Sequence, residues 1–133
     1  MVLAEVGRAE DFPNAFALIR NAHPDGLLVA VEPFIGKHIA EVIEFAATTR
    51  LPAFYDSGEP VLRGGLIAYA TVYIEHYAFA ADYVAKILKG AIPGDLPVQQ
   101  PARFELVINL QTAKALGISI PQAVLLRADE VIQ

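Results

Sequence analysis

Residues 104–133 read FELVINLQTAKALGISIPQAVLLRADEVIQ, and this stretch decides how the rest of the sequence is interpreted. From Phe104 to Asn109 apolar residues alternate with others, which is the period of a β-strand. Asn109 can cap the short helix that the next residues favour, and Gly117 can end that helix. The stretch therefore predicts a strand, a short helix, a turn that includes Pro121 and a last amphipathic segment.

Upstream, apolar runs alternate with patterns of helical spacing. The predicted strands cover residues 2–6, 27–31, 51–55 and 66–70, and the predicted helices cover residues 11–22, 37–49 and 72–88. Strands that alternate with helices favour an α/β fold with a parallel sheet and right-handed crossover connections. The three prolines in residues 91–102 predict an extended connector.

Composition restricts the class of protein. A chain of 133 residues has room for one domain with a core, and its hydrophobic fraction of 55% is too high for a disordered chain. The formal net charge of -5 argues against nucleic acid as a partner, since nucleic-acid binding needs a basic face.

Several kinds of site and segment are disfavoured. The chain contains no cysteine, which removes disulfides, thiolate catalysis and cysteine-ligated metals. The apolar run over residues 64–74 is shorter than the roughly 18 residues of a membrane helix. Residues 1–6 have neither the basic start nor the long apolar region of a signal peptide, so none is expected within this sequence.

Four further runs extend the pattern of residues 104–133 toward the N-terminus. They are AHPDGLLV at residues 22–29, GGL at residues 64–66, KG at residues 89–90 and DLPVQQP at residues 95–101. Together with the closing stretch, they closely resemble the C-terminal signature of the bacterial ABC transporter substrate-binding protein family, which includes tryptophan- and tyrosine-type binding proteins. The resemblance covers almost the whole chain.

The resemblance implies a periplasmic-binding-protein-like fold of type I, in which a ligand cleft lies between two α/β lobes. The chain looks like the C-terminal part of such a two-lobe protein. Residues 1–63 look like part of the second lobe, and residues 64–133 like the hinge crossing and the segments that complete the first lobe. Gly64 and Gly65 then mark the hinge. Ala70 departs from the family, where a glycine is usual.

The resemblance also implies partners and a location. Family members deliver a small solute to an ABC permease in the membrane, and they are periplasmic. If the crossing segments complete a sheet whose other strands lie elsewhere, their apolar faces and strand edges need a partner. We therefore expect a homodimer, and exchange of residues 64–133 between the chains is one way to form it.

Ligands of open α/β sheets bind beyond the carboxyl ends of the strands, where two loops of this chain are expected. The candidate ligand-binding residues are Glu32, Pro33, Phe34, Tyr55, Asp56 and Ser57. Phe34 and Tyr55 could form aromatic walls, and Asp56 or Glu32 could hold an ammonium group. The helix that follows Glu32 could receive a carboxylate at its N-terminus. The alternative is that these are ordinary loop residues, with Phe34 in the core.

Other motifs are incomplete. His38 and Glu41 lie three residues apart on one helix face, as two metal ligands can, but the sequence nearby offers no third ligand. Ser57 lacks the glycine-flanked elbow of a hydrolase nucleophile. No phosphate loop or dinucleotide fingerprint appears, so no metal or cofactor is predicted.

Three function classes follow, in decreasing order of support. The first is the solute-binding component of an ABC-type importer, which takes a small molecule such as an amino acid or an aromatic acid. The second is a self-associating α/β domain with a structural or regulatory role and no transport ligand. The third, an enzyme, is disfavoured because no catalytic constellation is visible.

Overall fold

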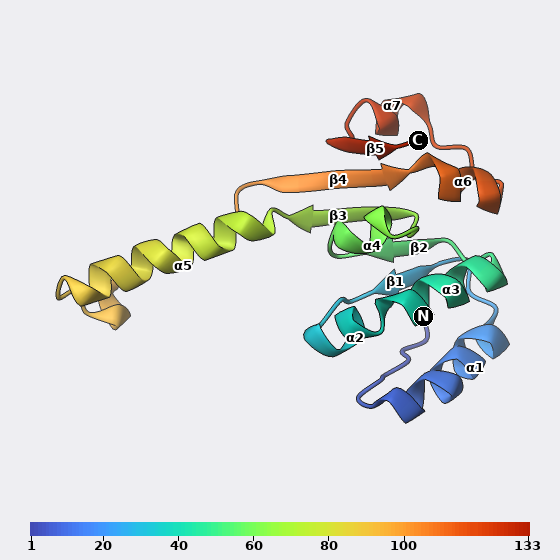
Figure 1. The fold of residues 1–133 in the computed structure, drawn as a ribbon, viewed down its shortest axis with the longest axis horizontal. Helices are drawn as coiled ribbons and strands as arrows, with labels where there is room; N and C mark the ends of the chain where they lie inside the picture. Colours follow the sequence, from blue (N-terminus) through green and yellow to red (C-terminus); the bar gives the residue numbers. More distant parts are fainter.

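A five-stranded sheet with the strand order β1-β2-β3-β4-β5 lies at the centre of the computed structural model (Figure 1). The structure describes the backbone of residues 1–133 and every side chain except that of Tyr73. The strands are β1 (Leu27–Val29), β2 (Ala53–Tyr55), β3 (Ile67–Thr71), β4 (Phe104–Asn109) and β5 (Glu130–Ile132).

Pairing within this sheet is mainly parallel. β1, β2 and β3 run parallel to one another, β4 is antiparallel to β3, and β5 is parallel to β4. The predicted α/β class is therefore confirmed. The sequence pattern did not predict the antiparallel pair, because strand direction depends on the path of the long connection between β3 and β4.

Helices alternate with the strands as predicted. They are α1 (Phe12–Ala22), α2 (Pro33–Lys37), α3 (Ile39–Thr49), α4 (Glu59–Leu62), α5 (Tyr73–Leu88), α6 (Leu110–Leu116) and α7 (Gln122–Leu125). Two short 3-10 turns, Ala9–Asp11 and Pro93–Asp95, complete the described elements. The helix predicted over residues 37–49 is divided at His38, whose backbone leaves the helical region between α2 and α3.

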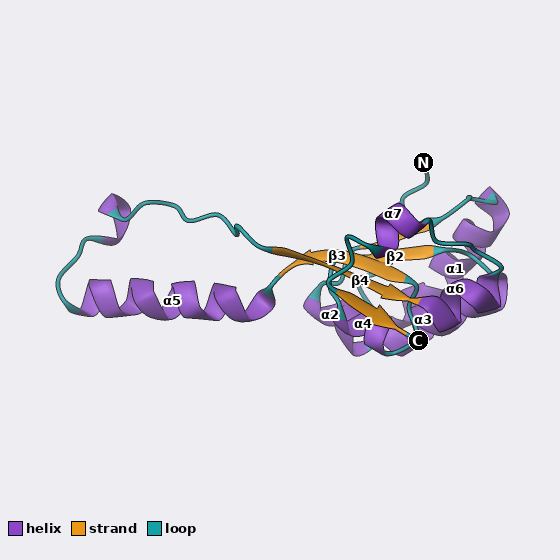
Figure 2. Ribbon diagram, turned by 90° about the horizontal axis from the view of Figure 1, so that it is seen from above, coloured by secondary structure: helices purple, strands orange, loops and turns teal.

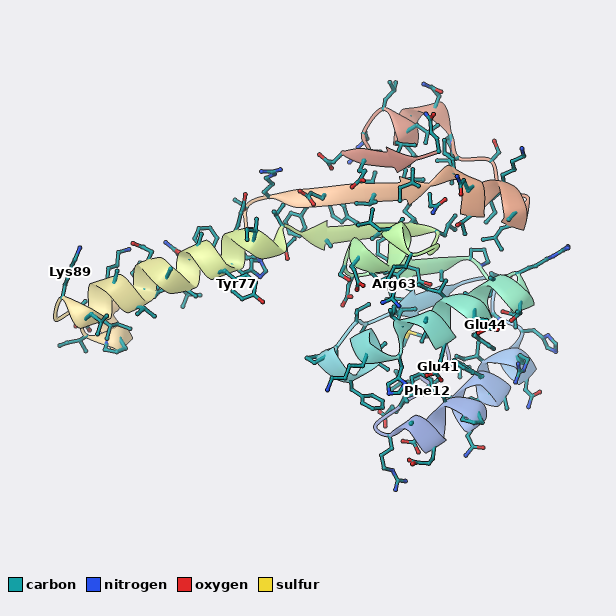
Figure 3. The ribbon with its side chains drawn as sticks, in the orientation of Figure 1. Phe12, Glu41, Glu44, Arg63, Tyr77 and Lys89 are labelled. Carbon is teal, nitrogen blue, oxygen red and sulfur yellow. The ribbon has the colours of Figure 1, made fainter. Side chains whose placement is uncertain are left out.

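The core lies between one face of the sheet and three helices. Its buried side chains come from the five-stranded sheet and from α1, α3 and α4, and they are Phe12, Val29, Ile39, Val42, Ala46, Ala53, Tyr55, Val61, Ala68 and Val107. Figure 3 shows Phe12 on α1 directed toward α2 and α3. The opposite face of the sheet is different, since it leaves Leu28 74% exposed and Tyr69 51% exposed.

The closing stretch folds as its sequence predicts. The Asn109 side chain accepts a hydrogen bond of 3.0 Å from the backbone N–H of Thr112 and so caps α6. Its amide nitrogen also donates to the Val61 carbonyl at 3.2 Å, which ties the end of β4 to α4. Gly117 ends α6 with φ of 73°, a left-handed conformation that suits glycine.

The strand predicted over residues 2–6 is wrong. These residues form no strand in the described backbone. They pack instead along one side of a groove of about 390 Å³, and Leu27, Leu28, Val29 and Ala30 line the groove as well. β1 is an edge strand whose outer edge pairs with none of the described strands, although residues 2–6 line the groove beside it.

α5 projects away from the sheet as an arm (Figures 1 and 2). None of its described residues from Ile74 to Leu88 is buried, and Tyr77 is 68% exposed. After the arm the chain returns to β4 through residues 89–103, and the Tyr83 hydroxyl donates a hydrogen bond to the Pro97 carbonyl on this return path.

Gly64 and Gly65 lie in the turn between α4 and β3, inside the sheet-bearing body. A side chain at Gly65 would bring its Cβ within 2.6 Å of Tyr55 Cε2 and 2.9 Å of the Pro60 carbonyl oxygen. The glycine therefore permits close approach of three segments. The sheet also continues across the boundary expected between residues 63 and 64, because β3 pairs with β2.

Replacing Gly65 tests this packing. We expect Gly65→Ala to lower the free energy of unfolding by about 2 kcal/mol, because the added methyl group overpacks against Tyr55 and Pro60. Gly94→Ala is the matched control, since nothing lies within 4 Å of a Cβ at that position. Urea denaturation of both variants measures the difference, and equal midpoints would contradict the packing described here.

Candidate functional site

A cavity of about 490 Å³ opens at the carboxyl edge of the parallel strands. Its walls come from the segments after β1 and β2, from the end of β3, and from β4 and β5. The lining residues are Val31, Glu32, Pro33, Gly36, Ser57, Gly58, Glu59, Leu62, Ala70, Thr71, Glu105, Val107 and Glu130. This is the position at which open α/β sheets bind ligands, and the volume suits a small molecule.

Three of the six predicted ligand residues line this cavity. Glu32 and Pro33 lie at the start of α2, and Ser57 lies just before α4. The structure thus brings together parts of the two loops that the strand-end rule selected. The other three predicted residues, Phe34, Tyr55 and Asp56, do not belong to the lining.

Phe34 packs in an aromatic cluster at the N-terminal ends of α1 and α3. Its ring centroid lies 6.2 Å from that of Phe12 and 4.9 Å from that of His38. His38 Nδ1 in turn lies 2.7 Å from Glu41 Oε1. These contacts match the alternative of the sequence analysis, in which Phe34 belongs to the packing rather than to a ligand wall.

Asp56 connects the ends of two neighbouring strands. Its Oδ1 accepts a hydrogen bond of 2.9 Å from the backbone N–H of Val31. Val31 lines the cavity, so Asp56 fixes the shape of one wall from outside the lining. Asp56 Oδ1 thus has a backbone partner, and the Asp56 side chain lies outside the cavity lining.

Tyr55 is fully buried beneath Gly65. Its hydroxyl has no hydrogen-bond partner among the described residues, and burial raises the pKa of this phenol to about 12. The side chain therefore supports the core and does not form an aromatic wall of the cavity.

The cavity is electronegative. Among its described lining residues, four carry carboxylates (Glu32, Glu59, Glu105 and Glu130) and none is a lysine, arginine or histidine. Glu59 and Glu105 each pair with an arginine that is not among the lining residues: Arg63 Nη1 lies 3.1 Å from Glu59 Oε1, and Arg103 Nη2 lies 3.4 Å from Glu105 Oε1. A site of this sign favours a cationic or ammonium-bearing ligand.

Sequence reasoning missed the contribution of the last three strands. Thr71 reaches the cavity at the carboxyl end of β3, which is parallel to β2, whereas Glu105 and Glu130 reach it only because β4 runs antiparallel to β3 and β5 parallel to β4. The sequence pattern did not indicate the directions of β4 and β5 in the sheet. Had the start of β4 been placed beside the end of β3, Glu105 would have been a candidate.

The described residues offer no cluster of three or more metal-ligating side chains. None of the helices they form has the length and apolar character needed to cross a membrane.

The buried Tyr55 hydroxyl yields a pH-dependent prediction. We expect Tyr55→Phe to keep the free energy of unfolding near neutral pH, or to raise it by up to about 1 kcal/mol, since it removes a buried polar group. The folded protein holds this phenolic proton to about pH 12, whereas the unfolded chain loses it near pH 10.0. Stability that is present below pH 10 is therefore lost as pH rises toward 12, and the variant lacks this loss.

Urea denaturation at about pH 8 and about pH 11 measures both effects. Tyr69→Phe is the control, because Tyr69 is 51% exposed on the other face of the sheet. A loss of about 2 kcal/mol in Tyr55→Phe near neutral pH would contradict the absence of a partner for the hydroxyl.

Comparisons with known proteins agree on the family and fold. A protein-family model described as ABC transporter substrate binding protein matches residues 1–132. A comparison with curated proteins gives no match. Among solved structures, a conserved domain protein from Vibrio cholerae O1 biovar eltor is 33% identical, with a TM-score of 0.85 over 93% of this chain and 42% of that chain.

Two further solved structures are similar. One is an ABC domain in complex with L-Trp from Streptococcus pneumonia, which is 25% identical with a TM-score of 0.85 over 96% of this chain and 43% of that chain. The other is the ligand-free, open form of a substrate binding protein with adhesive properties from Clostridium difficile. Its 20% identity and TM-score of 0.65, over 96% of this chain and 42% of that chain, show the fold alone. The chain thus spans less than half the length of these solved structures.

Proposed function

Because the chain belongs to the ABC transporter substrate binding protein family, we propose that it forms the solute-binding part of an ABC-type importer. A single observation carries this proposal: the cavity of about 490 Å³ lies at the carboxyl edge of the sheet, between the segments that follow β1 and β2. The family is one of substrate-binding proteins rather than of enzymes. In keeping with that family, the solute would pass to a membrane permease on the periplasmic side of a bacterial membrane.

The solute we propose is a small amino acid or a related aromatic molecule that carries an ammonium group. Glu32, at the cavity wall, would accept hydrogen bonds from that group, and Ser57 and Thr71 would contribute hydroxyls. The electronegative lining supports this choice. A relative of 25% identity that is in complex with L-Trp supports it as well.

The arm defines where we propose the lobes to meet. β3 and β4 belong to the same sheet as β1, and the chain leaves this sheet at Val72 and re-enters it at Arg103. We therefore propose the crossing at these two points, in place of Gly64 and Gly65. The exposed side chains of α5 would pack into a second α/β lobe, and that lobe would close over the cavity by hinge motion.

The open edges of the described sheet are consistent with a larger lobe. Leu28 on β1 is 74% exposed, and the groove between β1 and residues 2–6 is lined mainly by apolar residues. We propose that a further strand occupies this groove and extends the sheet beyond β1.

Isothermal titration calorimetry tests the proposed solute class. We expect L-tryptophan or another L-amino acid to bind, and indole-3-propionate, which lacks the ammonium group, to bind at least tenfold more weakly. Glu32→Gln should weaken binding of the amino acid about tenfold, because it replaces a charged acceptor by a neutral one.

Glu44→Gln is the matched control. Glu44 lies on α3 (Figure 3), is exposed and does not belong to the cavity lining. Equal weakening by both substitutions would mean that net charge, and not the cavity, governs binding. Tighter binding of indole-3-propionate than of any amino acid would contradict the proposed ammonium contact.

A second candidate function is self-association without a transport ligand, and the arm is the observation that favours it. Ile74 is 72%, Tyr77 68% and Leu88 82% exposed, which is unusual for apolar residues that are spread along one helix. In this second function, two copies of the chain form a homodimer by exchanging residues 64–133, and each copy covers α5 of the other.

Light scattering at micromolar concentration distinguishes these outcomes. If a second copy covers the arm, the protein is a dimer, and Tyr77→Asp with Leu88→Asp gives a monomer. Glu44→Gln again serves as the control. A monomer for the parent chain would rule out the exchanged dimer and leave the arm to a second lobe.

A further inference from the structure

Arg103 lies at the point where the chain re-enters the sheet from the arm. Thr71 and Phe104 are paired in the β3–β4 ladder, and the backbone N–H of Val72 donates to the Arg103 carbonyl at 3.4 Å. The two chain segments that connect the arm to the body therefore lie side by side at this position. Any change in the direction of α5 relative to the sheet must take place here.

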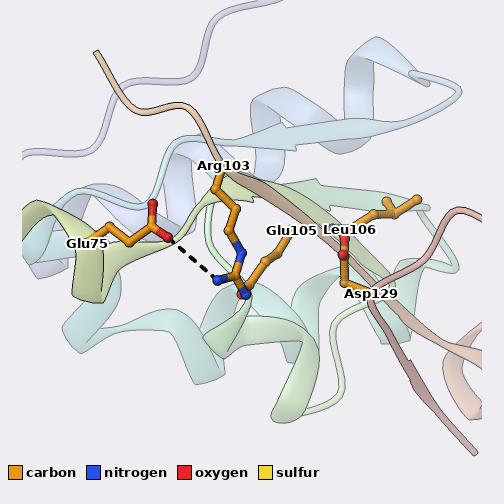
Figure 4. A network of polar contacts seen from close by, with 5 residues as sticks. All are labelled: Glu75, Arg103, Glu105, Leu106 and Asp129. Atoms are coloured by element: carbon orange, nitrogen blue, oxygen red, sulfur yellow. Dashed lines mark hydrogen bonds and ion pairs between the residues drawn. The ribbon is translucent and has the colours of Figure 1, made fainter. Parts of the chain in front are cut away.

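The Arg103 side chain bridges the arm and the body (Figure 4). Its Nη1 lies 3.6 Å from Glu75 Oε1, in the first turn of α5, and its Nη2 lies 3.4 Å from Glu105 Oε1, on β4. The described side chains of α5 are not buried against the sheet, so apolar packing contributes little to the orientation of the helix. An ion-pair bridge at the base of the helix can then bias its orientation.

One end of this bridge belongs to the solute cavity. Glu105 lines the cavity next to Ala70 and Thr71 at the end of β3. The same carboxylate thus faces both the guanidinium of Arg103 and the space that a solute would occupy. A cationic group in the cavity competes with Arg103 for Glu105.

We propose that Arg103 is a positioning residue that couples occupancy of the cavity to the orientation of α5. When Glu105 is engaged by a cationic group, Arg103 shifts toward Glu75 and holds the arm in one orientation. When the cavity is empty, Arg103 is shared between the two carboxylates and the arm samples a wider range. The coupling is reciprocal, so fixing the arm also changes solute affinity. The cationic ligand in this inference rests on the proposed function, whereas the effect of Arg103 on the orientation of α5 does not.

The effect of Arg103 on the orientation of α5 can be tested without a ligand. The chain has no cysteine, so Glu44→Cys on α3 and Lys89→Cys beyond α5 place two spin labels at exposed positions, one on the body and one on the arm. Pulsed electron paramagnetic resonance then measures the distribution of distances between them. We expect Glu75→Gln to broaden this distribution, because it frees the arm from Arg103.

Glu105→Gln should act in the opposite direction. It imitates a neutralised carboxylate, leaves Arg103 to Glu75 alone and narrows the distribution. Since exposed ion pairs are weak, we expect the equilibrium between the held orientation of α5 and its wider range to change about two- to fivefold. Arg103→Gln should resemble Glu75→Gln, and Arg103→Lys should retain part of the parent behaviour.

Lys86→Gln is the matched control. It breaks an ion pair of 2.6 Å with Asp82 on the same helix, away from the crossing, and should leave the distribution unchanged. Circular dichroism confirms that each variant is folded. If Glu75→Gln, Glu105→Gln and Lys86→Gln all match the parent, or if the first two change the distribution in the same direction, the inference is overturned.

The same distance measurement with added ligand separates this inference from the proposed function. Saturating L-tryptophan should shift the distance distribution of the parent in the direction of Glu105→Gln, and the shift should be lost in Arg103→Gln. Calorimetry without binding of L-tryptophan or any other amino acid would count against the proposed solute class, and the ligand-free distances would still decide the role of Arg103. Binding without any shift in the parent would overturn the coupling.

Discussion

The antiparallel ladder between β3 and β4 is the constraint on which the rest of the structure depends. Five residue pairs, from Ile67 with Ile108 to Thr71 with Phe104, join the N-terminal strands to the C-terminal ones. This ladder makes one sheet from segments that are separated by the whole arm. It also fixes where the arm begins and ends, since Thr71 and Phe104 face each other at its last pair.

The same ladder builds the candidate site. β4 starts where β3 ends, so Glu105 comes to the edge that already carries the segments after β1 and β2. β5 follows β4 in parallel, and Asp129 secures this pairing because its carboxylate accepts a hydrogen bond of 2.8 Å from the Leu106 N–H. Glu130 then reaches the same cavity. An acidic pocket at the base of a projecting helix is the direct consequence of this order and direction of strands.

Much of this arrangement could be predicted from local sequence. The alternation from Phe104 to Asn109, the cap at Asn109 and the glycine at position 117 act over a few residues, and each formed as expected. The strand-end rule also selected Glu32, Pro33 and Ser57, which line the same cavity at one edge of the sheet. These features depend on periodicity and on chain connectivity, which a single sequence contains.

The features that could not be predicted from the sequence depend on contacts between segments that are distant along the chain. Residues 2–6 are as apolar as a strand, but apolar composition alone does not form one, and they line the groove beside β1 without joining its free edge as a strand. Tyr55 and Asp56 have side chains suited to ligands, but Tyr55 is buried in the core and Asp56 accepts a hydrogen bond from the Val31 N–H. Glu105 gave no local signal at all, because its role arises from its pairing with Ala70.

Native mass spectrometry of the gently purified protein tests the central claim most directly. We predict that the folded chain carries a small amine-bearing solute in a stoichiometric amount, and that denaturation releases a molecule whose mass identifies it as an amino acid or a close relative. A protein that carries no solute, and that gains none when incubated with a full set of amino acids before the measurement, would contradict the claim that the acidic cavity is a solute site.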